Sequence, residues 1–508
     1  MEKRLIIAMA LSFLLLLAWS VMMPKQHPIE KKEVTTIETS PVLEHAPEAP
    51  PPSFDRPSIK DAKIIDYRQE QYTITFIEPL AAIQKVKFSD YQSATLSLQN
   101  GLLLNDRSLL FTKQQSSPEE IIFLHTDSSK KVTKKFIFSN SNYDMWLEIA
   151  IENLSDVPLA ITMPLILGTL DFSSQNPDAR YQDVAVGTKE KVSHVNPRKD
   201  FKVTEVNFLA LRERYFCAII DPQQKPLDGY IKKSVNHDSE IGLNLRNVLV
   251  APGQEFKEKF HIYLGPQDLG KIQNLNPAWA AVVHYGTFDF ISQILLKLLQ
   301  FFYGLVHNWG WSIMLLSIAV YLLLFPLTLK QMHSMKQMQA LQPHIEALKK
   351  QHKDNPQRMQ KEQMELFRKH KVNPLGGCLP LLLQMPIFIA LYQTLMRSVF
   401  LRGASFLWIK DLSGPDRLFA LPFPKPFDSF NLLPILMTIG MFIQQKITTA
   451  TTAVGSSAEQ QKMMMIMMPL LFGFIFYSMP AGLVLYWFIN STLMLGNQLY
   501  QLRISRIQ

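Results

Sequence analysis

The stretch Asn373–Tyr392 constrains the fold of this 508-residue chain more than any other part of it. A basic, polar segment ends at its first two residues, and an apolar run of membrane length begins at once. That run contains Pro380, Pro386 and the amide Gln384. Proline frees backbone carbonyl groups, and in lipid these groups and the amide must be satisfied by protein or water. We therefore expect a membrane helix that faces other helices or a wet cavity.

Five apolar runs span, or nearly span, a bilayer, whose core needs about 20 apolar residues in a helix. They are Leu5–Met23, Trp309–Leu329, Leu375–Met396, Leu432–Ile447 and Met463–Asn497. The last run is too long for one crossing, and Ser478-Met-Pro-Ala-Gly482 divides it into two short helices, so the sequence predicts six crossings. The alternative for the first run is a cleaved signal peptide, because Ala18-Trp-Ser20 loosely resembles a signal-peptidase site. The bulky residues that follow favour an uncleaved anchor.

Basic residues near the crossings predict the orientation of the chain. Segment 330–373 carries ten basic and four acidic residues, which is a net charge of +6. Region 24–286 carries 30 basic and 33 acidic residues, which is a net charge of −3. Six crossings are consistent with a cytoplasmic location of segment 330–373 and of both termini. Residues 24–286 are then expected outside the cytoplasm.

The exported region is expected to contain a linker and a β-domain. Residues 24–58 are rich in Pro, Glu and Thr and predict an extended linker. From about 60 to 266 the apolar and polar residues alternate, as in Met145–Ile151, and turn residues separate the runs. This pattern predicts an antiparallel β-sandwich. In Phe288–Val306 the spacing becomes helical and predicts an amphipathic helix on the membrane surface, with packing against the β-domain as the alternative.

The polar segment 331–372 has a helical composition. Pro343 starts a first helix, and Pro356 suits the first position of a second, with Asn355 as its cap. We therefore expect a cytoplasmic hairpin of two helices of about four turns each. Its basic charge is either a solvated face or a surface that binds a partner, for example RNA or a nascent chain.

The chain lacks the sequence signatures of common enzyme classes. It has no P-loop, nucleophile elbow or HExxH motif, and the predicted crossings contain no Asp or Glu. Cys217 falls in the exported domain and Cys378 in a membrane helix, so we expect no disulfide or zinc site. The sequence predicts a protein that is not an enzyme and that uses no cofactor or metal.

Amides, hydroxyls and tyrosines take the place of charges in the predicted crossings. In the second and the last crossing these residues share one helix face, by steps of four and seven. The candidate groove residues are Ser317, Tyr321, Gln384, Gln444, Tyr486 and Asn490. A single polar residue in a membrane helix usually just bonds to a neighbouring helix, worth about 0.6 kcal/mol. Matched polar faces on several helices favour a shared, partly hydrated groove that holds a hydrophilic client segment.

Several motifs between about residues 270 and 500 resemble the YidC membrane-protein insertases, the bacterial branch of the Oxa/Alb/YidC family. The motifs are Phe325-Pro-Leu-Thr328, Leu341-Gln-Pro343, Asn373-Pro-Leu-Gly-Gly-Cys378, Leu383-Gln-Met-Pro-Ile-Phe388, Leu407-Trp-Ile-Lys-Asp-Leu412, Leu433-Pro-Ile-Leu436 and Pro480-Ala-Gly-Leu-Val-Leu-Tyr486. The β-domain, in the right place but with a diverged sequence, indicates the Gram-negative type with a large periplasmic domain.

The resemblance implies an insertase and folding chaperone of the inner membrane that works alone or beside the Sec translocon. Its clients would be nascent inner-membrane proteins, held in a groove open to cytoplasm and lipid and closed towards the periplasm. The ribosome and the signal-recognition machinery become candidate partners of the hairpin. Gln384 matches a groove-lining glutamine of the family, Ser317 a groove hydroxyl, and Asn490 a polar position on the last helix.

One position departs from the family pattern. The family typically carries a groove arginine five residues before the proline of its Tyr-Pro-Leu-Thr motif, and here that position is Tyr321. The cations Arg397 and Lys446 are expected near helix ends, where they snorkel. We therefore predict a groove that works by hydration and hydrogen bonding more than by charge attraction.

The sequence as a whole predicts a polytopic α-helical membrane protein with six crossings, a five-helix insertase core, a periplasmic antiparallel β-sandwich domain and a cytoplasmic helical hairpin. The expected parts are an anchor at 1–23, a linker at 24–58, the β-sandwich at 59–270, an interfacial helix at 287–307, crossings at 309–330, 375–397, 431–447, 463–479 and 481–500, the hairpin at 331–372, a periplasmic loop at 398–430, and a cytoplasmic loop and tail at 448–462 and 501–508. A channel or transporter and a structural subunit of a translocon remain as alternatives.

Overall fold

The computed structural model describes residues 63–505, apart from short gaps. The gaps are 107, 140–142, 174, 175, 177, 235–237, 246, 247, 353, 354, 371, 373–378, 425, 426 and 453–457. The predicted anchor at 1–23 and linker at 24–58 lie outside the described residues, and so does Cys378.

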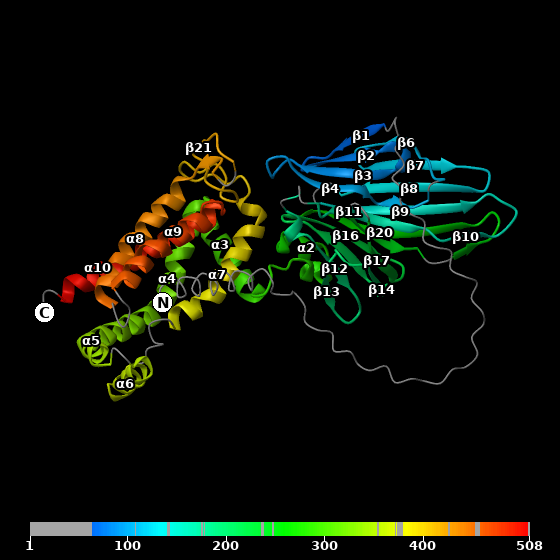
Figure 1. Ribbon diagram of the computed structural model, residues 1–508. Helices are drawn as coiled ribbons and strands as arrows, with labels where there is room; N and C mark the ends of the chain where they lie inside the picture. The colour runs from blue at the N-terminus through cyan, green and yellow to red at the C-terminus, as the bar shows by residue number, and fades with distance from the viewer. Residues whose placement is uncertain are drawn as a thin grey trace, which may run out of the picture. The chain divides into compact units, whose positions relative to one another are not determined.

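The first part of the described chain is a β-domain (Figure 1). Its strands are β1 Ile64–Arg68, β2 Tyr72–Ile77, β3 Ala82–Phe88, β4 Ala94–Gly101, β5 Leu103–Leu104, β6 Thr112–Ser116, β7 Glu120–Thr126, β8 Lys130–Phe138, β9 Asp144–Asn153, β10 Leu159–Ile161, β11 Pro164–Asp171, β12 Asp183–Gly187, β13 Val192–Val195, β14 Phe201–Val206, β15 Phe208–Arg212, β16 Phe216–Pro222, β17 Leu227–Lys233, β18 Asp238–Asn244, β19 Val248–Val250 and β20 Glu255–Pro266. Short helices η1 (Glu78–Leu80), η2 (Ala179–Tyr181), η3 (Pro277–Val282) and α2 (Leu269–Leu275) accompany them.

These strands form large antiparallel sheets. The nine-stranded sheet has the order β13-β12-β15-β16-β20-β9-β8-β7-β6, and the five-stranded sheet has the order β14-β17-β18-β11-β5. A four-stranded sheet, β1-β2-β3-β4, and the pair β10-β19 complete the domain. The prediction of an antiparallel β-domain is confirmed.

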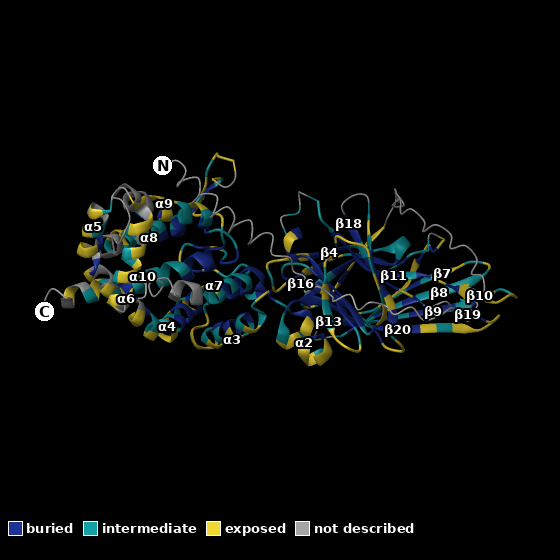
Figure 2. Ribbon diagram, turned by 60° about the horizontal axis from the view of Figure 1, so that its bottom comes forward, coloured by how far each residue is buried: buried dark blue, intermediate teal, exposed yellow. Residues whose placement is uncertain are grey.

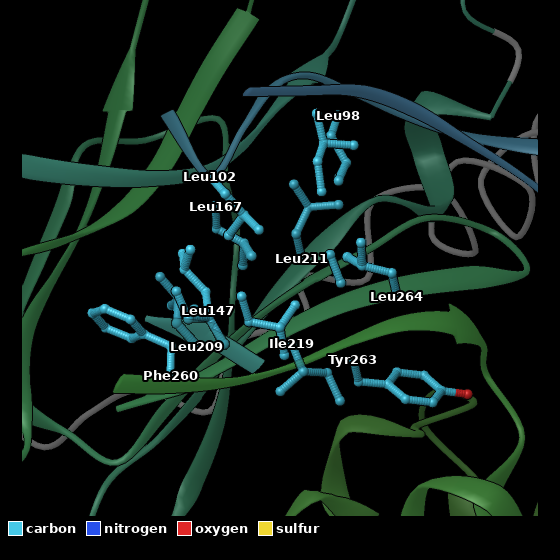
Figure 3. Packing of buried hydrophobic residues seen from close by; sticks show 14 of the residues in the cluster. Leu98, Leu102, Leu147, Leu167, Leu209, Leu211, Ile219, Phe260, Tyr263 and Leu264 are labelled. Carbon is cyan, nitrogen blue, oxygen red and sulfur yellow. The ribbon is translucent and has the colours of Figure 1, made fainter. Parts of the chain in front are cut away.

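The alternating sequence pattern decides which strand faces form the core. In β9, Met145, Leu147, Ile149 and Ile151 are buried while the residues between them are mostly half-buried, as the period of two requires. Figure 3 shows Leu98, Leu147 and Leu211 converging with residues of neighbouring strands, and Figure 2 shows buried residues concentrated in the sheets. One continuous apolar core therefore holds the β-domain together.

Lys134 of β8 is an ionisable side chain inside this apolar core. It is fully buried, and its Nζ donates to the carbonyl oxygens of Ala81 and Leu102, each at 2.6 Å. Both carbonyls belong to residues with positive φ, 45° and 59°, where the strand ladder is interrupted. Burial lowers the pKa of Lys134 to about 7, since the interior penalises the charged form. The lysine satisfies two backbone groups that the turns would otherwise leave buried and unpaired.

The second part of the described chain is helical. Its helices are α3 Asp289–Val306, α4 Trp309–Ala340, α5 Gln342–Gln351, α6 Pro356–Lys369, α7 Leu379–Arg397, α8 Leu432–Thr452, α9 Ala458–Phe476 and α10 Ala481–Ser505. Between α7 and α8 lie η5 (Val399–Leu401) and the short strands β21 (Phe419–Ala420) and β22 (Ser429–Phe430). By length and composition, Asp289–Val306 and Trp309–Lys330 are long and apolar enough to cross a membrane, and Leu432–Ile447 and Met465–Phe476 are shorter apolar helices.

Several helices run past the ends predicted from the apolar runs. Helix α4 continues to Ala340, ten residues into the segment predicted as hairpin, and α10 continues to Ser505. Helix α8 ends, and helix α9 begins, inside the predicted loop 448–462. The reason is that hydropathy marks the part of a helix that suits lipid, whereas Lys, Gln and Met continue a helix into water equally well.

The predicted hairpin forms after this extension of α4. Helix α5 has 10 residues, fewer than the four turns expected, and α6 has 14. Asn355 caps α6 as predicted, with Oδ1 accepting from the Arg358 amide at 3.1 Å. A small core that includes Ile345 and Phe367 joins the two helices.

Helix α3 has two apolar faces. One face, with Leu295 and Leu299, packs among α4 and α7, and the Ser292 hydroxyl donates to the carbonyl of Ala390 at 3.0 Å. The opposite face exposes Phe290 and Phe301. A membrane-surface position for α3 fits this exposed apolar face and stays a prediction.

Candidate functional site

Helix α10 lies at the centre of the helical region. It packs against α4, α7 and α8, and α8 packs in turn against α9 (Figure 1). Any site shared by these helices must therefore involve the faces of α10. The polar residues predicted as a groove come from the same four helices, α4, α7, α8 and α10.

Polar side chains of two neighbouring helices meet the polar face of α10. Tyr321 of α4 lies beside Asn497, and Gln384 of α7 lies beside Tyr486. The hydroxyl groups of Tyr321 and Tyr486 are buried, and neither makes a hydrogen bond of standard geometry with the described residues. Each phenolic group thus lies beside an amide side chain in the interior of the helical region.

Helix α8 supplies a third polar contact to the same face. Its Gln444 amide donates to Met494, with 3.0 Å between Nε2 and Sδ. Met494 follows Asn490 by one turn of α10, so both lie on the face that carries Tyr486. From Tyr486 to Asn497 this face extends roughly 16 Å along the helix axis. We call Tyr321, Gln384 and Gln444, together with Tyr486, Asn490, Met494 and Asn497 of α10, the α10 tract.

Not all of the predicted residues are equally accessible in the structure. Ser317 is fully buried, and its hydroxyl donates to the carbonyl of Ile313 in its own helix at 2.7 Å. Tyr486 is also almost completely buried. Tyr321, Gln384 and Asn490 are half-buried. The structure thus brings Tyr321 and Gln384 to α10, the helix that carries Tyr486, whereas the Ser317 hydroxyl is already bonded within α4.

Packing is uneven along these helices. The fully buried side chains gather in 310–320 of α4, 390–397 of α7, 432–438 of α8, 473–476 of α9 and 481–486 of α10, which we call the packed half. In the remaining described residues of these helices, the open half, only Thr328 and Pro469 are buried. Tyr321, Gln384, Gln444 and Asn490 all belong to the open half. Four of the six polar candidates therefore lie where the helices are least closely packed, whereas Ser317 and Tyr486 lie in the packed half.

Of the two membrane-adjacent cations, Arg397 belongs to the packed half. Arg397 was expected to snorkel at a helix end, but protein surrounds it and leaves 9% of it exposed. Its Nη1 donates to the carbonyl of His284 at 3.3 Å, and its guanidinium lies 5.8 Å from the ring centre of Tyr181. The expectation was wrong because the β-domain offers this arginine a carbonyl and an aromatic face in place of water. Lys446 is exposed, as expected.

Sequence reasoning missed one partner in the tract and left another out of the candidate set. Met494 was missed because methionine counts as an apolar residue in a sequence pattern, although its thioether sulfur is a weak acceptor. Asn497 shares the helix face of Tyr486 and Asn490, so the step of seven was the signal for it. Among the described residues no group of His, Cys, Asp and Glu is arranged to hold a metal ion.

Comparisons with known proteins agree with the two-part architecture. Residues 58–298 match the family model described as YidC periplasmic domain, and residues 301–507 match the one described as 60Kd inner membrane protein. A membrane protein insertase YidC of Pelobacter propionicus is 31% identical over 98% of this chain and 99% of its own length. The corresponding protein of Nitrosococcus oceani is 30% identical over 98% of each chain.

Two solved structures are similar to this chain at lower identity. A crystal structure described as an active YidC insertase with its first transmembrane domain resolved is 19% identical, with a TM-score of 0.43, and covers 87% of this chain and 93% of its own. A YidC structure from Thermotoga maritima is 15% identical, with a TM-score of 0.32, and covers 85% and 98%. The full-length matches at 30% identity and above decide the relation: the chain belongs to the YidC family of membrane protein insertases.

Proposed function

We propose that this protein inserts membrane segments of client proteins by receiving their hydrophilic parts in the α10 tract. One observation supports this most strongly: Tyr321, Gln384 and Gln444 come from three helices and meet one polar face of α10. Apart from Tyr486, the residues of the tract lie in the open half of the bundle, where a client has room to approach. Nascent inner-membrane proteins are the proposed clients, with the Sec translocon as a partner.

The physical role of the tract is to lower the cost of moving polar groups into the membrane. An amide or hydroxyl without a hydrogen bond costs about 2–7 kcal/mol in an apolar environment. Hydroxyl and amide groups along α10 can bond such groups in turn while the apolar client segment partitions into lipid. This requires no nucleotide and no covalent step.

The tract selects its clients by hydrogen bonding and hydration. At position 321, where the resemblance leads us to expect an arginine, a tyrosine hydroxyl lies beside Asn497. A neutral hydroxyl donates and accepts, so it has no preference for acidic client segments over basic ones. We therefore propose a broad client range with little dependence on ionic strength.

The proposed topology has six crossings, with both termini cytoplasmic and residues 24–286 periplasmic. The charge distribution supports it, because the basic segment 330–373 lies at one end of α4 and the β-domain precedes the other. The hairpin is then cytoplasmic. Helix α6 exposes Arg358, Lys361, Arg368 and Lys369, which suits an acidic partner such as ribosomal RNA of a translating ribosome or the signal-recognition machinery.

Site-specific photo-cross-linking tests the α10 tract. A photoreactive residue is placed at 321, 384 or 490, and a radiolabelled single-span client is arrested during insertion. We expect cross-links at these three positions and none at the buried position 317. Strong cross-links at position 397 with none at the three tract positions would contradict the proposal.

Reconstitution separates insertion from the alternatives. Purified full-length protein in liposomes is expected to insert a single-span client without further factors. Flux of small solutes without insertion would favour a channel or transporter. A structural subunit would be favoured if the protein alone gave neither insertion nor flux, and if insertion appeared only after translocon was added.

A further inference from the structure

The segment 398–431 between α7 and α8 folds onto the start of α10. The first two amides of this helix, Ala481 and Gly482, donate to the carbonyls of Gly414 and Leu412 at 2.7 and 2.9 Å. A helix start leaves such amides without partners in its own backbone. A Cβ on Gly482 would lie 3.1 Å from the Leu412 oxygen, so the two backbones approach as closely as glycine permits. The loop thus fixes α10 through main-chain bonds.

The same segment holds the neighbouring ends of α8 and α9. Asp416 is buried and accepts from the Leu433 amide at the start of α8, with 2.6 Å from nitrogen to Oδ2. Asn431 donates to the carbonyl of Tyr477, just after α9, at 2.7 Å. The Tyr477 hydroxyl donates back to the carbonyl of Ser429 at 2.8 Å. These bonds tie three helix ends to one folded loop.

Close side-chain packing reinforces this end of the bundle. Phe406 of the segment lies against Gly310 at the start of α4, where a Cβ would meet its ring. Helices α8 and α9 touch at Thr438 and Gly473, and a Cβ on Gly473 would lie 3.3 Å from the Thr438 Cβ. Atoms packed as densely as this resist separation because many contacts must break at once.

The open half shows the opposite features. A Cβ added at Gly440 of α8 or at Gly496 of α10 would have no neighbouring atom within 4 Å. Among the described residues of the open half, only Thr328 and Pro469 are buried. The free-energy cost of moving these helix ends apart is therefore much smaller than at the packed half.

We propose that the packed half and the 398–431 segment form a fixed pivot, and that clients are admitted by separation of the helix ends in the open half. The link between this motion and client admission rests on the proposed function. The difference in mobility between the two halves does not depend on it. Asp416 and Asn431 are positioning residues of the pivot. They hold the ends of α8 and α9 beside α10, and so set how the α10 tract closes again.

Spin-label distances test the pivot without any client. The full-length protein, with Cys217→Ala and Cys378→Ala, receives label pairs on α4 and α9, in lipid nanodiscs. One pair, at Ile318 and Phe474, lies in the packed half, and the other, at Leu329 and Ile466, lies in the open half; all four side chains are exposed. We expect the open-half distance distribution to be at least twice as broad as the packed-half one. Equal widths would overturn the pivot whether or not the protein inserts clients.

Reversible cross-links test the link between this motion and insertion. Thr438→Cys with Gly473→Cys locks the packed half, because the Cβ spacing of 3.3 Å is near the roughly 3.8 Å of a disulfide. Gln444→Cys with Met494→Cys, joined by a cleavable bifunctional thiol reagent, locks the open half. Each locked protein is compared with its own reduced form, and a monofunctional reagent of similar size controls for simple occlusion.

We expect the open-half lock to slow client insertion at least tenfold and the packed-half lock to change it less than twofold. Equal slowing by both locks, or no slowing by the open-half lock beyond the monofunctional reagent, would overturn the pivot. Failure of the proposed function looks different, since the unmodified protein would then insert no client although the label distances still differ.

Discussion

At the scale of single residues, the protein uses neutral polar groups where a charge would be costly. Gln384 and Tyr321 each face a polar residue of α10, and neither carries a charge that lipid would penalise. The converse case is Lys134 in the β-domain, which is buried but bonded to two carbonyls. In each of these cases it is the partner that makes a buried polar group tolerable.

Replacing Gln384 by leucine should slow client insertion about fivefold. The change removes one amide from the α10 tract, and a hydrogen bond contributes about 1 kcal/mol net. Initial rates of insertion into proteoliposomes measure it. Gln445→Leu is the matched control, because it removes the same type of side chain from α8, on a face next to that of Gln444. It should leave the rate unchanged. An equal loss in both variants would speak against a specific role for Gln384.

Replacing Tyr321 by arginine should change which clients the tract prefers. A fixed positive charge beside Asn497 attracts acidic segments, and the attraction weakens with salt. We expect a client with an acidic hydrophilic segment to be inserted several times faster than its basic counterpart, at low ionic strength only. Tyr321→Phe should show no such preference. The same charge dependence in the unmodified protein would contradict a neutral groove.

The stability of the β-domain should rise with pH because of Lys134. Its pKa in the folded state is about 7, below the ordinary lysine value of 10.5, so between these values the unfolded state binds more protons. Lys134 therefore makes stability increase from about pH 7 to about pH 10.5 and contributes no slope below pH 7. Denaturant unfolding at several pH values measures this. Lys134→Met should remove the slope, whereas the exposed Lys85→Met should keep it.

At the scale of elements, the loop between α7 and α8 is more ordered than its sequence indicates. The sequence predicts a periplasmic loop at 398–430, and the structure shows a folded segment bonded to the ends of α8, α9 and α10. Individual residues such as Asp416 give no sign of this, since their partners are main-chain groups of other elements, as the Leu433 amide of α8 is for Asp416. A helix start supplies these partners because its first amides are unpaired.

Loss of the Asp416 carboxylate should destabilise the helical region. Asp416→Ala removes the acceptor of the Leu433 amide and leaves it buried, which we expect to cost about 1–3 kcal/mol. Thermal unfolding in detergent, followed by the helical signal, should show a lower melting temperature. Asp428→Ala changes the same residue type in the same loop and should have little effect. A melting temperature unchanged by Asp416→Ala would show that the loop does not hold α8.

At the scale of the whole molecule, a buried arginine joins parts of the chain that are far apart in sequence. Arg212 Nη1 lies 3.0 Å from both carboxylate oxygens of Asp183, and Nη2 donates to Gln267 and to the carbonyl of His284. The Arg212 guanidinium holds the pKa of Asp183 below its usual range despite burial. This network closes the end of the β-domain just before the chain enters α3.

Removing Arg212 alone should lower the unfolding free energy more than removing Arg212 and Asp183 together. Arg212→Met leaves the Asp183 carboxylate buried without its charge partner, and we expect a loss of about 3–5 kcal/mol in unfolding free energy. Adding Asp183→Leu should recover part of that loss. Arg198→Met, at an exposed arginine, serves as the control. A double variant no more stable than Arg212→Met would contradict this account.

The sequence by itself determined the class of the protein and most of its elements. Apolar runs of membrane length, the period-two pattern of the β-domain and the cap at Asn355 all depend on neighbouring residues, and local patterns record such preferences directly. The motif Asn373–Cys378 and its companions led to the family, which the full-length relatives confirm. The helix periodicity also predicted the polar faces of α4 and α10.

Only the tertiary structure decided which of these residues meet and where the bundle is loose. Ser317 and Tyr321 share a helix face, yet Ser317 is buried and bonded within α4 while Tyr321 reaches Asn497. The burial of Arg397 and the bond of Asp416 to Leu433 likewise depend on how separate elements are placed against each other. Periodicity fixes the direction of a side chain relative to its own helix, whereas packing density and partners arise only when helices are placed against each other.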